Sequence, residues 1–215
     1  SKNFKEVLKN QLKIIRYPSI WILGLASATM YVTRYAINSW GVLYLQEGRG
    51  YSLIEAGGLV GLNTFTGIIG CVAYGYISDK YFGARRPPVT LMFGIAEIGS
   101  LFLIFYGPQS TLVLTIAFII YGFSLSGLLA VLGGLFAIDI APKNITGAAM
   151  GFIGLFSYIG AAIQEKVSSV LIKSTQPDVN SAIVYDFDSV IIFWISASVV
   201  SFLLSLSLWN HKIKD

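Results

Sequence analysis

The sequence has 215 residues, of which 55% are hydrophobic and 12% are charged, and its formal net charge is +4. With a mean hydropathy of +0.71, this composition excludes an ordinary soluble protein and predicts an all-α integral membrane protein. Most Lys and Arg residues lie outside the hydrophobic stretches, so they indicate membrane topology, and we expect no nucleic-acid partner. The single cysteine, Cys71, lies in an apolar stretch, so we expect neither a disulfide nor a thiolate metal site.

Residues 1–19 form a basic segment ahead of the first hydrophobic stretch. The sequence predicts an amphipathic helix over residues 1–17, lying among lipid headgroups on the cytoplasmic side. Its lysines share one face, and its apolar face is formed by Phe4, Leu8, Leu12 and Ile15. The sequence opens at Ser1 without an initiator methionine or a signal-peptide pattern, which favours a fragment or a processed product.

The first hydrophobic stretch, residues 20–45, is long enough to cross a bilayer and carries Arg34 near its middle. An arginine at that depth costs about 2.5–3.5 kcal/mol on insertion scales, and it stays charged. It must therefore face protein, water or an anion.

A polar stripe surrounds this arginine, because Ser27, Tyr31, Arg34 and Asn38 recur at the spacing of one helical face. This face carries a hydroxyl, a phenol, a guanidinium and an amide. Such a face indicates the wall of a pathway for an anionic solute. The alternative is a structural arginine bound to backbone carbonyls or to Glu97. Glu97 lies midway along the third stretch, where we expect it to be protonated or at an interface.

Five further hydrophobic stretches cover residues 56–77, 89–106, 112–140, 145–172 and 190–209. Basic residues concentrate in alternate connections, whereas the other connections hold only Arg49 and Lys173. The positive-inside rule therefore predicts that both termini are cytoplasmic, with residues 20–209 as a six-helix transmembrane domain and 210–215 as a cytoplasmic tail. Small residues four apart predict close helix approaches; they are Gly57 and Gly61, Ser126, Ala130 and Gly134, and Gly147 and Gly151.

Residues 75–86 connect the second and third stretches through a short polar turn. Asp79 lies at the C-terminal end of one helix, and Arg85 and Arg86 lie at the N-terminal end of the next. Helix dipoles disfavour each placement by about 0.3–1 kcal/mol, so we expect these charges to pair with each other or with another helix end. The expected cap of the fifth helix, Asn144, is a candidate partner for Asp79. Such a cluster would latch an outward-open state; the alternative is charge that only sets topology.

The spacing Gly75-x-x-x-Asp79-Lys80, followed by Gly83-x-Arg85-Arg86, resembles the major facilitator superfamily signature with a longer turn. Other segments are similar to the C-terminal half of its organophosphate:phosphate antiporters. They are Tyr31-Val-Thr-Arg34-Tyr35 with Trp40, Asp139-Ile-Ala-Pro142-Lys143, and residues 147–158. The resemblance covers nearly the whole chain and implies one half of a twelve-helix bundle in the cell (inner) membrane, partnered by an N-terminal six-helix half.

The resemblance also implies roles for individual residues. Arg34 would bind a phosphoryl group opposite an arginine of the N-terminal half, with Tyr31 and Tyr158 around the substrate and Asn38 as an inferred member. Ordinary helix packing is the alternative for Tyr158. The residues implied in conformational gating are Asp79, Lys80, Arg85 and Arg86. The chain departs from the hexose-phosphate members, which carry an Asp and a Lys where it has Met150 and Ile153.

We therefore expect secondary active transport of a phosphorylated small metabolite, such as glycerol phosphate or a sugar phosphate, in exchange for inorganic phosphate. The transport would proceed by alternating access, and we expect neither a cofactor nor a metal. The alternative is a transporter-like membrane sensor of a sugar phosphate with little net transport. We expect no enzyme, because the single histidine, His211, lies beyond the last stretch and the sequence shows no nucleophile–base pair.

Overall fold

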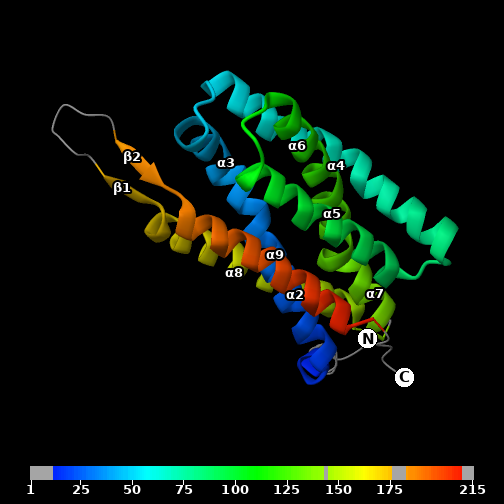
Figure 1. Cartoon of the computed structure of the whole chain (residues 1–215). Coiled ribbons are helices and arrows are strands. Elements are labelled where there is room, and N and C mark those ends of the chain that lie inside the picture. The colour runs from blue at the N-terminus through cyan, green and yellow to red at the C-terminus, as the bar shows by residue number, and fades with distance from the viewer. Residues whose placement is uncertain (1–11, 143–144, 176–182, 210–215) are drawn as a thin grey trace.

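The structure, a computed structural model, describes residues 12–142, 145–175 and 183–209. This part of the chain contains six helices that are long and apolar enough to cross a membrane (Figure 1). They cover Pro18–Gly48, Leu53–Phe82, Arg86–Tyr106, Thr111–Asp139, Thr146–Leu171 and Asp188–Ser207. The predicted all-α membrane fold and the six predicted stretches are confirmed, with ends that differ by a few residues.

The first span is composite. A 3-10 helix, η1 (Leu12–Arg16), leads into helix α2 (Pro18–Tyr35), whose first residue is a proline that has no N–H to leave unpaired. Then follow a π-helix, η2 (Ala36–Trp40), a short helix, α3 (Gly41–Leu43), and a second π-helix, η3 (Tyr44–Gly48). The predicted amphipathic helix lies mostly outside the described residues; in its described part, Ile14 is buried and Leu12 and Ile15 are exposed.

The remaining elements are helical except for one hairpin. Helix α4 (Leu53–Phe82) begins with a capping box between Ser52 and Glu55, and helix α5 (Arg86–Tyr106) follows it. The fourth span combines α6 (Thr111–Ala130), a π-helix η4 (Val131–Leu135) and α7 (Phe136–Ile140). Helix α8 (Thr146–Leu171) leads to strands β1 (Lys173–Thr175) and β2 (Val184–Asp186), which pair antiparallel, and helix α9 (Asp188–Ser207) closes the bundle.

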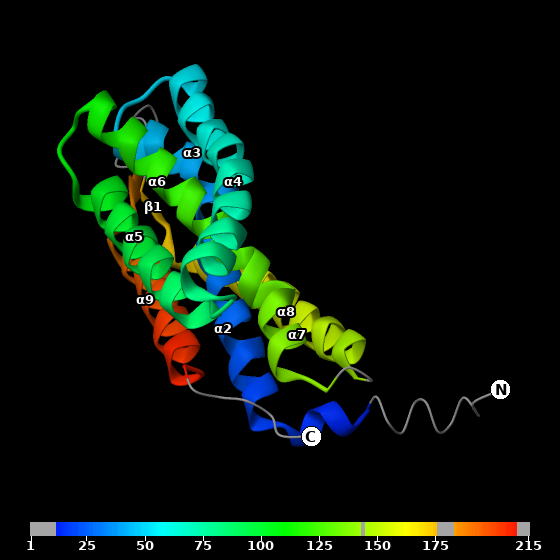
Figure 2. The same ribbon diagram turned by 90° about the vertical axis from the view of Figure 1, so that its right-hand side faces the viewer.

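The helices pack in a fixed order of neighbours. Helix α4 packs on α6, α2 packs on α8 and α9, and α5 packs on α6 and α9. We call the end where α2 begins and α9 ends the basic end, and the opposite end, with β1 and β2, the hairpin end (Figure 2). Helices α4 and α8 bury least: 28% of the most apolar window of each is buried, against 44–56% in the other spans. These two helices therefore present long faces to lipid or to another domain.

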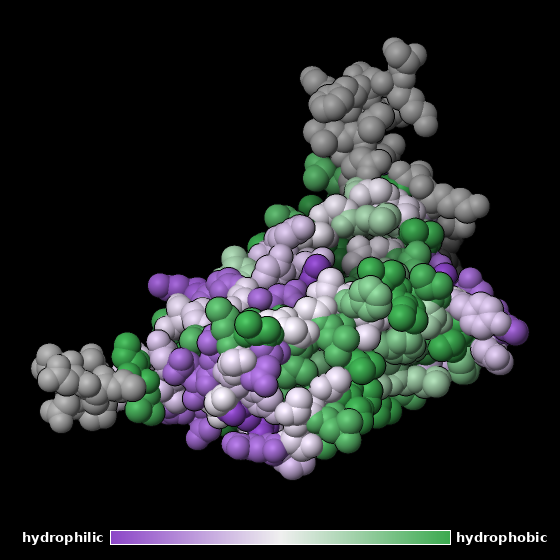
Figure 3. Space-filling model, turned by 90° about the horizontal axis from the view of Figure 1, so that it is seen from above, coloured by the Kyte–Doolittle hydropathy of each residue, from purple (hydrophilic) through white to green (hydrophobic). Residues whose placement is uncertain are grey.

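The surface agrees with a membrane-spanning bundle. Seen along the view of Figure 3, hydrophobic residues form a band across the middle of the molecule, and most hydrophilic residues gather toward its two ends. Exposed apolar side chains on α4 contribute to the apolar surface; they include Phe65, Ile68, Ile69 and Val72. A bilayer solvates such a band at no cost in free energy, whereas water would not.

The helices approach one another closely at glycines, but most of these are not the glycines that the spacing predicted. A Cβ on Gly160 would lie 2.2 Å from the Ala28 carbonyl oxygen, and one on Gly70 would lie 1.9 Å from that of Phe123. These glycines let α8 reach α2 and α4 reach α6. Four of the predicted glycines make no close approach within this chain, since an added Cβ would meet no described atom within 4 Å; they are Gly57, Gly61, Gly147 and Gly151. Of the remaining small residues, Ser126 closely faces Gly67, and Gly134 faces Met150.

We predict that Gly160→Ala destabilises the protein by about 1–3 kcal/mol, because the new methyl group must push α8 away from α2. The matched control is Gly154→Ala in the same helix, where an added Cβ meets nothing within 4 Å. This control should be neutral or stabilising by up to about 1 kcal/mol through helix propensity. Thermal unfolding in detergent measures both variants, and equal melting temperatures would contradict the tight crossing.

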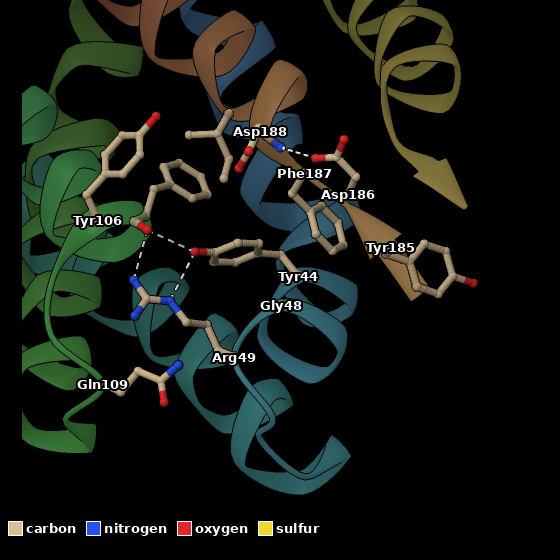
Figure 4. Close-up of a pocket in the computed structure, with 11 residues that line it drawn as sticks. Tyr44, Gly48, Arg49, Tyr106, Gln109, Tyr185, Asp186, Phe187 and Asp188 are labelled. Carbon is tan, nitrogen blue, oxygen red and sulfur yellow. Dashed lines mark hydrogen bonds between the residues drawn. The ribbon is translucent and has the colours of Figure 1, made fainter. Parts of the chain in front are cut away.

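An arginine fastens two helices at the hairpin end (Figure 4). The guanidinium of Arg49 donates hydrogen bonds to the carbonyl oxygens of Ile104, Phe105 and Gly107, each at 2.9 Å, and to the Tyr44 hydroxyl at 3.0 Å. Tyr44 in turn donates to the Phe105 carbonyl at 3.1 Å. The last carbonyls of a helix have no partner within it, so Arg49 caps α5 and ties it to the end of the first span.

We predict that Arg49→Met lowers the free energy of unfolding by about 2–4 kcal/mol, because several charge-assisted hydrogen bonds are lost and carbonyls at the end of α5 are left unpaired. Thermal unfolding of the purified protein checks this. Lys173→Met removes an exposed basic residue at the same end and should change the melting temperature little. A similar loss in both variants would show that Arg49 acts only through its charge.

Candidate functional site

Arg34 lies in the last turn of α2, immediately before the π-helix η2, and its side chain is half-buried. Short π segments inside helices are frequent at functional sites. The irregular backbone there has a partner, since the Tyr121 hydroxyl of α6 donates to the Thr33 carbonyl at 3.0 Å. The Trp40 indole at the end of η2 donates to Glu165 of α8 at 3.0 Å. Two neighbouring helices thus hold the chain on either side of Arg34.

A cavity of about 410 Å³ opens beside Arg34, between the first span, α4 and α6. Its wall mixes polar and apolar side chains. The polar residues are Arg34, Asn38, Asn63, Thr64 and Ser126, and the other lining residues include Gly67, Ile68, Cys71, Leu125, Leu129 and Ala130. A concave site with a few polar groups among apolar ones is the usual form of a small-molecule site.

The Arg34 guanidinium has aromatic neighbours and no ionic partner among the described residues. Its central carbon lies 5.4 Å from the ring centre of Tyr31 and 5.9 Å from that of Tyr35, which are cation–π distances. The carboxylate of Glu97 is buried elsewhere, where it accepts a hydrogen bond from Ser198 between α5 and α9. The alternative in which Arg34 is locked to Glu97 is therefore wrong.

Of the four predicted substrate-binding residues, Arg34 and Asn38 line the cavity, whereas Tyr31 and Tyr158 lie beside Arg34 outside its lining. Asn38 is exposed and lines the same cavity as Arg34. Tyr31 lies between Arg34 and Tyr158, whose ring centre is 5.9 Å from that of Tyr31 in an edge-on arrangement. Tyr158 is 65% exposed, so it does not merely fill space between helices of this chain.

Ser27 does not belong to this wall, although its spacing placed it on the polar stripe. It is fully buried, and its hydroxyl shares a 2.7 Å hydrogen bond with Ser157 of α8. Asn63, Thr64 and Ser126 were missed by the sequence analysis. The signal available was a run of polar residues, Asn63-Thr64, inside an apolar span, and this run alone does not say which face points to Arg34.

The predicted gating residues lie at the basic end. Arg86 donates to Asp79 at 3.4 Å and to Asp139 at 3.1 Å, and it also donates to Ser78 at 3.2 Å. The expected pairing of Asp79 with a neighbouring arginine is confirmed, and Asp139 is a partner that the spacing did not reveal. The cluster joins the ends of α4 and α7 to the start of α5.

The other two basic residues of this turn have different surroundings. The Lys80 ammonium lies 4.9 Å from the ring centre of Tyr76 and 5.7 Å from that of Tyr81. Arg85 is exposed and precedes the first residue of α5. The proposed contact of Asp79 with Asn144 lies outside the described residues.

Comparison with known proteins assigns this chain to a family. The family described as Major Facilitator Superfamily matches residues 2–164. The membrane sensor protein UhpC of Escherichia coli (strain K12) is 36% identical over 165 residues, which cover 74% of this chain and 36% of that protein. The glycerol-3-phosphate transporter of Bacillus subtilis (strain 168) is 33% identical over 160 residues, covering 74% of this chain and 34% of its own length.

A third relative matches nearly the whole chain. The probable hexose phosphate transport protein of Chlamydia pneumoniae is 28% identical over 219 residues, covering 99% of this chain and 43% of that protein. The chain thus spans less than half the length of these relatives. The family match extends over more than half of the sequence, and the six spans agree with it. This chain is a multi-pass membrane protein that belongs to the Major Facilitator Superfamily.

Proposed function

We propose that this chain supplies half of a transporter that exchanges a phosphorylated small metabolite for inorganic phosphate by alternating access. The observation that carries the proposal is the guanidinium of Arg34, which stands at membrane depth, beside a cavity, without an ionic partner among the described residues. Relatives of this chain are named as glycerol-3-phosphate and hexose phosphate transporters. A phosphorylated metabolite fits both the charge and these names.

The chemistry of Arg34 favours a phosphoryl ligand. A guanidinium keeps its charge, and its planar set of N–H donors matches two oxygens of a phosphate group. Helix α2 begins at Pro18, so Arg34 lies about 24 Å along the span at about 1.5 Å per residue. Tyr158 lies about 18 Å along α8 by the same rise. Both side chains therefore lie well inside the bilayer, where an unpaired charge is costly without a ligand.

The remaining contacts to the substrate would come from an N-terminal six-helix half. The exposed faces of α4 and α8 are available to it, since these helices bury least of their surface. From the distribution of Lys and Arg we infer that the basic end is cytoplasmic. The helical spans and the bacterial relatives favour the cell (inner) membrane. Alternating access would then expose the cavity beside Arg34 to each side in turn.

The Arg86 cluster would act in this movement as a fastening within one half. It holds α4, α5 and α7 together at the basic end, so these helix ends would move as a unit. Lys80 and Arg85 are exposed at the same end and are free to meet the other half when it closes.

A second candidate is a sensor that binds the same ligand and passes the signal to a membrane partner with little net transport. The similarity to the membrane sensor protein UhpC favours it. Binding of a sugar phosphate without exchange in liposomes would identify a sensor, and exchange would identify a transporter.

We predict that Arg34→Ala reduces phosphate exchange at least about 100-fold, because two charge-assisted hydrogen bonds of about 1.5–3 kcal/mol each are lost. Arg34→Lys should still lose about 10-fold, since an ammonium group cannot form the two-pronged contact. The measurement is exchange by the complete protein in phosphate-loaded liposomes. Arg16→Ala, at an exposed arginine, is the control. Undiminished exchange by Arg34→Ala would reject the role of Arg34.

We predict that Arg86→Lys slows exchange several-fold and leaves phosphate affinity unchanged, because one lysine nitrogen cannot occupy both the Nε and Nη1 positions that contact Asp139 and Asp79. Its stability should change by less than about 1 kcal/mol, since partly exposed ion pairs contribute little. Exchange rate, phosphate affinity and melting temperature are measured together, with Arg16→Lys as the control. A lower affinity at an unchanged rate would contradict a role in gating.

A further inference from the structure

Asn63 of α4 is a buried amide in the wall of the Arg34 cavity. Its side chain belongs to a residue that is 5% exposed, and its Nδ2 atom has no hydrogen-bond partner among the described residues. Burying an unpaired amide donor costs about 1–3 kcal/mol. This nitrogen is closed off from the cavity, whereas the residue itself lines it. A 180° turn of the amide exchanges its oxygen and nitrogen, so a ligand group in the cavity can meet either atom, and such a turn would release the buried donor.

The backbone around Asn63 is held firmly. Helices α4 and α6 cross so closely there that a Cβ on Gly122 would lie 2.1 Å from the Asn63 carbonyl oxygen. The Thr66 hydroxyl also donates to this carbonyl at 3.2 Å. The amide is therefore presented from a rigid crossing of two helices, which is the kind of support that a selective site requires.

The composition of the cavity wall limits what the partner can be. Arg34 is the only charged residue among the described residues that line it, so it takes the anionic part of a ligand. The neighbouring polar groups, on Asn38, Thr64 and Ser126, are neutral. An amide offers both a donor and an acceptor, as an alcohol does. Asn63 is thus suited to a neutral hydroxyl group, and the guanidinium is suited to the phosphoryl group.

We propose that Asn63 determines substrate specificity by hydrogen-bonding a hydroxyl group on the organic part of the phosphorylated substrate while Arg34 holds its phosphoryl group. This inference rests on the proposed function. It implies selection for hydroxylated phosphate monoesters over alkyl phosphates, because a site built to bind a hydroxyl group rejects a ligand that lacks it.

The test compares three probes that compete with labelled phosphate for the complete protein in detergent. The probes are inorganic phosphate, glycerol 3-phosphate and propyl phosphate, which lacks the hydroxyl groups. The unmodified protein should prefer glycerol 3-phosphate over propyl phosphate by about 10-fold, as one hydrogen bond of about 1.4 kcal/mol provides. Asn63→Leu should reduce this preference to within about 2-fold while its affinity for inorganic phosphate stays the same.

The matched control is Gln164→Leu, which removes another fully buried amide with an unpaired atom among the described residues, outside the Arg34 cavity. This variant should keep the preference. Asn63→Leu should also keep or raise the melting temperature of the ligand-free protein, whereas a merely structural amide would lower it. If Asn63→Leu does not fold, Asn63→Ala, which adds no volume, is measured in the same way.

The outcomes separate this inference from the proposed function. An unchanged preference in the Asn63 variant, or no preference in the unmodified protein, would overturn the role of Asn63 and leave the phosphate site standing. Absence of phosphate binding in the unmodified protein would overturn the proposed function itself.

Discussion

Backbone polar groups at membrane depth need partners within the protein, and this constraint shapes the whole chain. Long helices satisfy it locally. Where the first span departs from a regular helix, other helices add contacts: Tyr121 donates to the Thr33 carbonyl, which also accepts from the Ala36 N–H, and Trp40 donates to Glu165. At the end of α5, Arg49 caps the last carbonyls. The irregular segment beside Arg34 is therefore held in place by other helices. The Arg34 guanidinium stands out because it has no ionic partner among the described residues.

Much of the fold follows from the sequence because the bilayer leaves few choices. About 20 apolar residues in a row must form a spanning helix, so the six spans could be predicted closely. The pairing of Asp79 with Arg86 could also be predicted, since a short turn brings both charges to adjoining helix ends. Arg34 was recognisable as a candidate because charge is rare at such depth.

Contacts between helices were harder to predict, because they depend on which face of each helix meets its neighbour. Gly57 and Gly61 have the spacing of a packing motif, yet the close crossings lie at Gly70 and Gly160. Asp139 lies far from Arg86 in the sequence, so that nothing local points to their contact. Asn63 could not be predicted for the same reason, because its proposed role depends on a cavity lined by three spans that are separate in the sequence.

The π-helix after Arg34 has a geometric consequence for the chain that follows it. A π turn holds one residue more than an α turn, so residues beyond it are rotated by about 100° about the helix axis relative to a continuous α-helix. Losing one residue from Ala36–Trp40 would restore a regular helix and turn Asn38 and Tyr44 toward different neighbours. Segment length there is thus more strictly constrained than residue identity, and homologues that bind through this face should tolerate substitutions in it more readily than deletions.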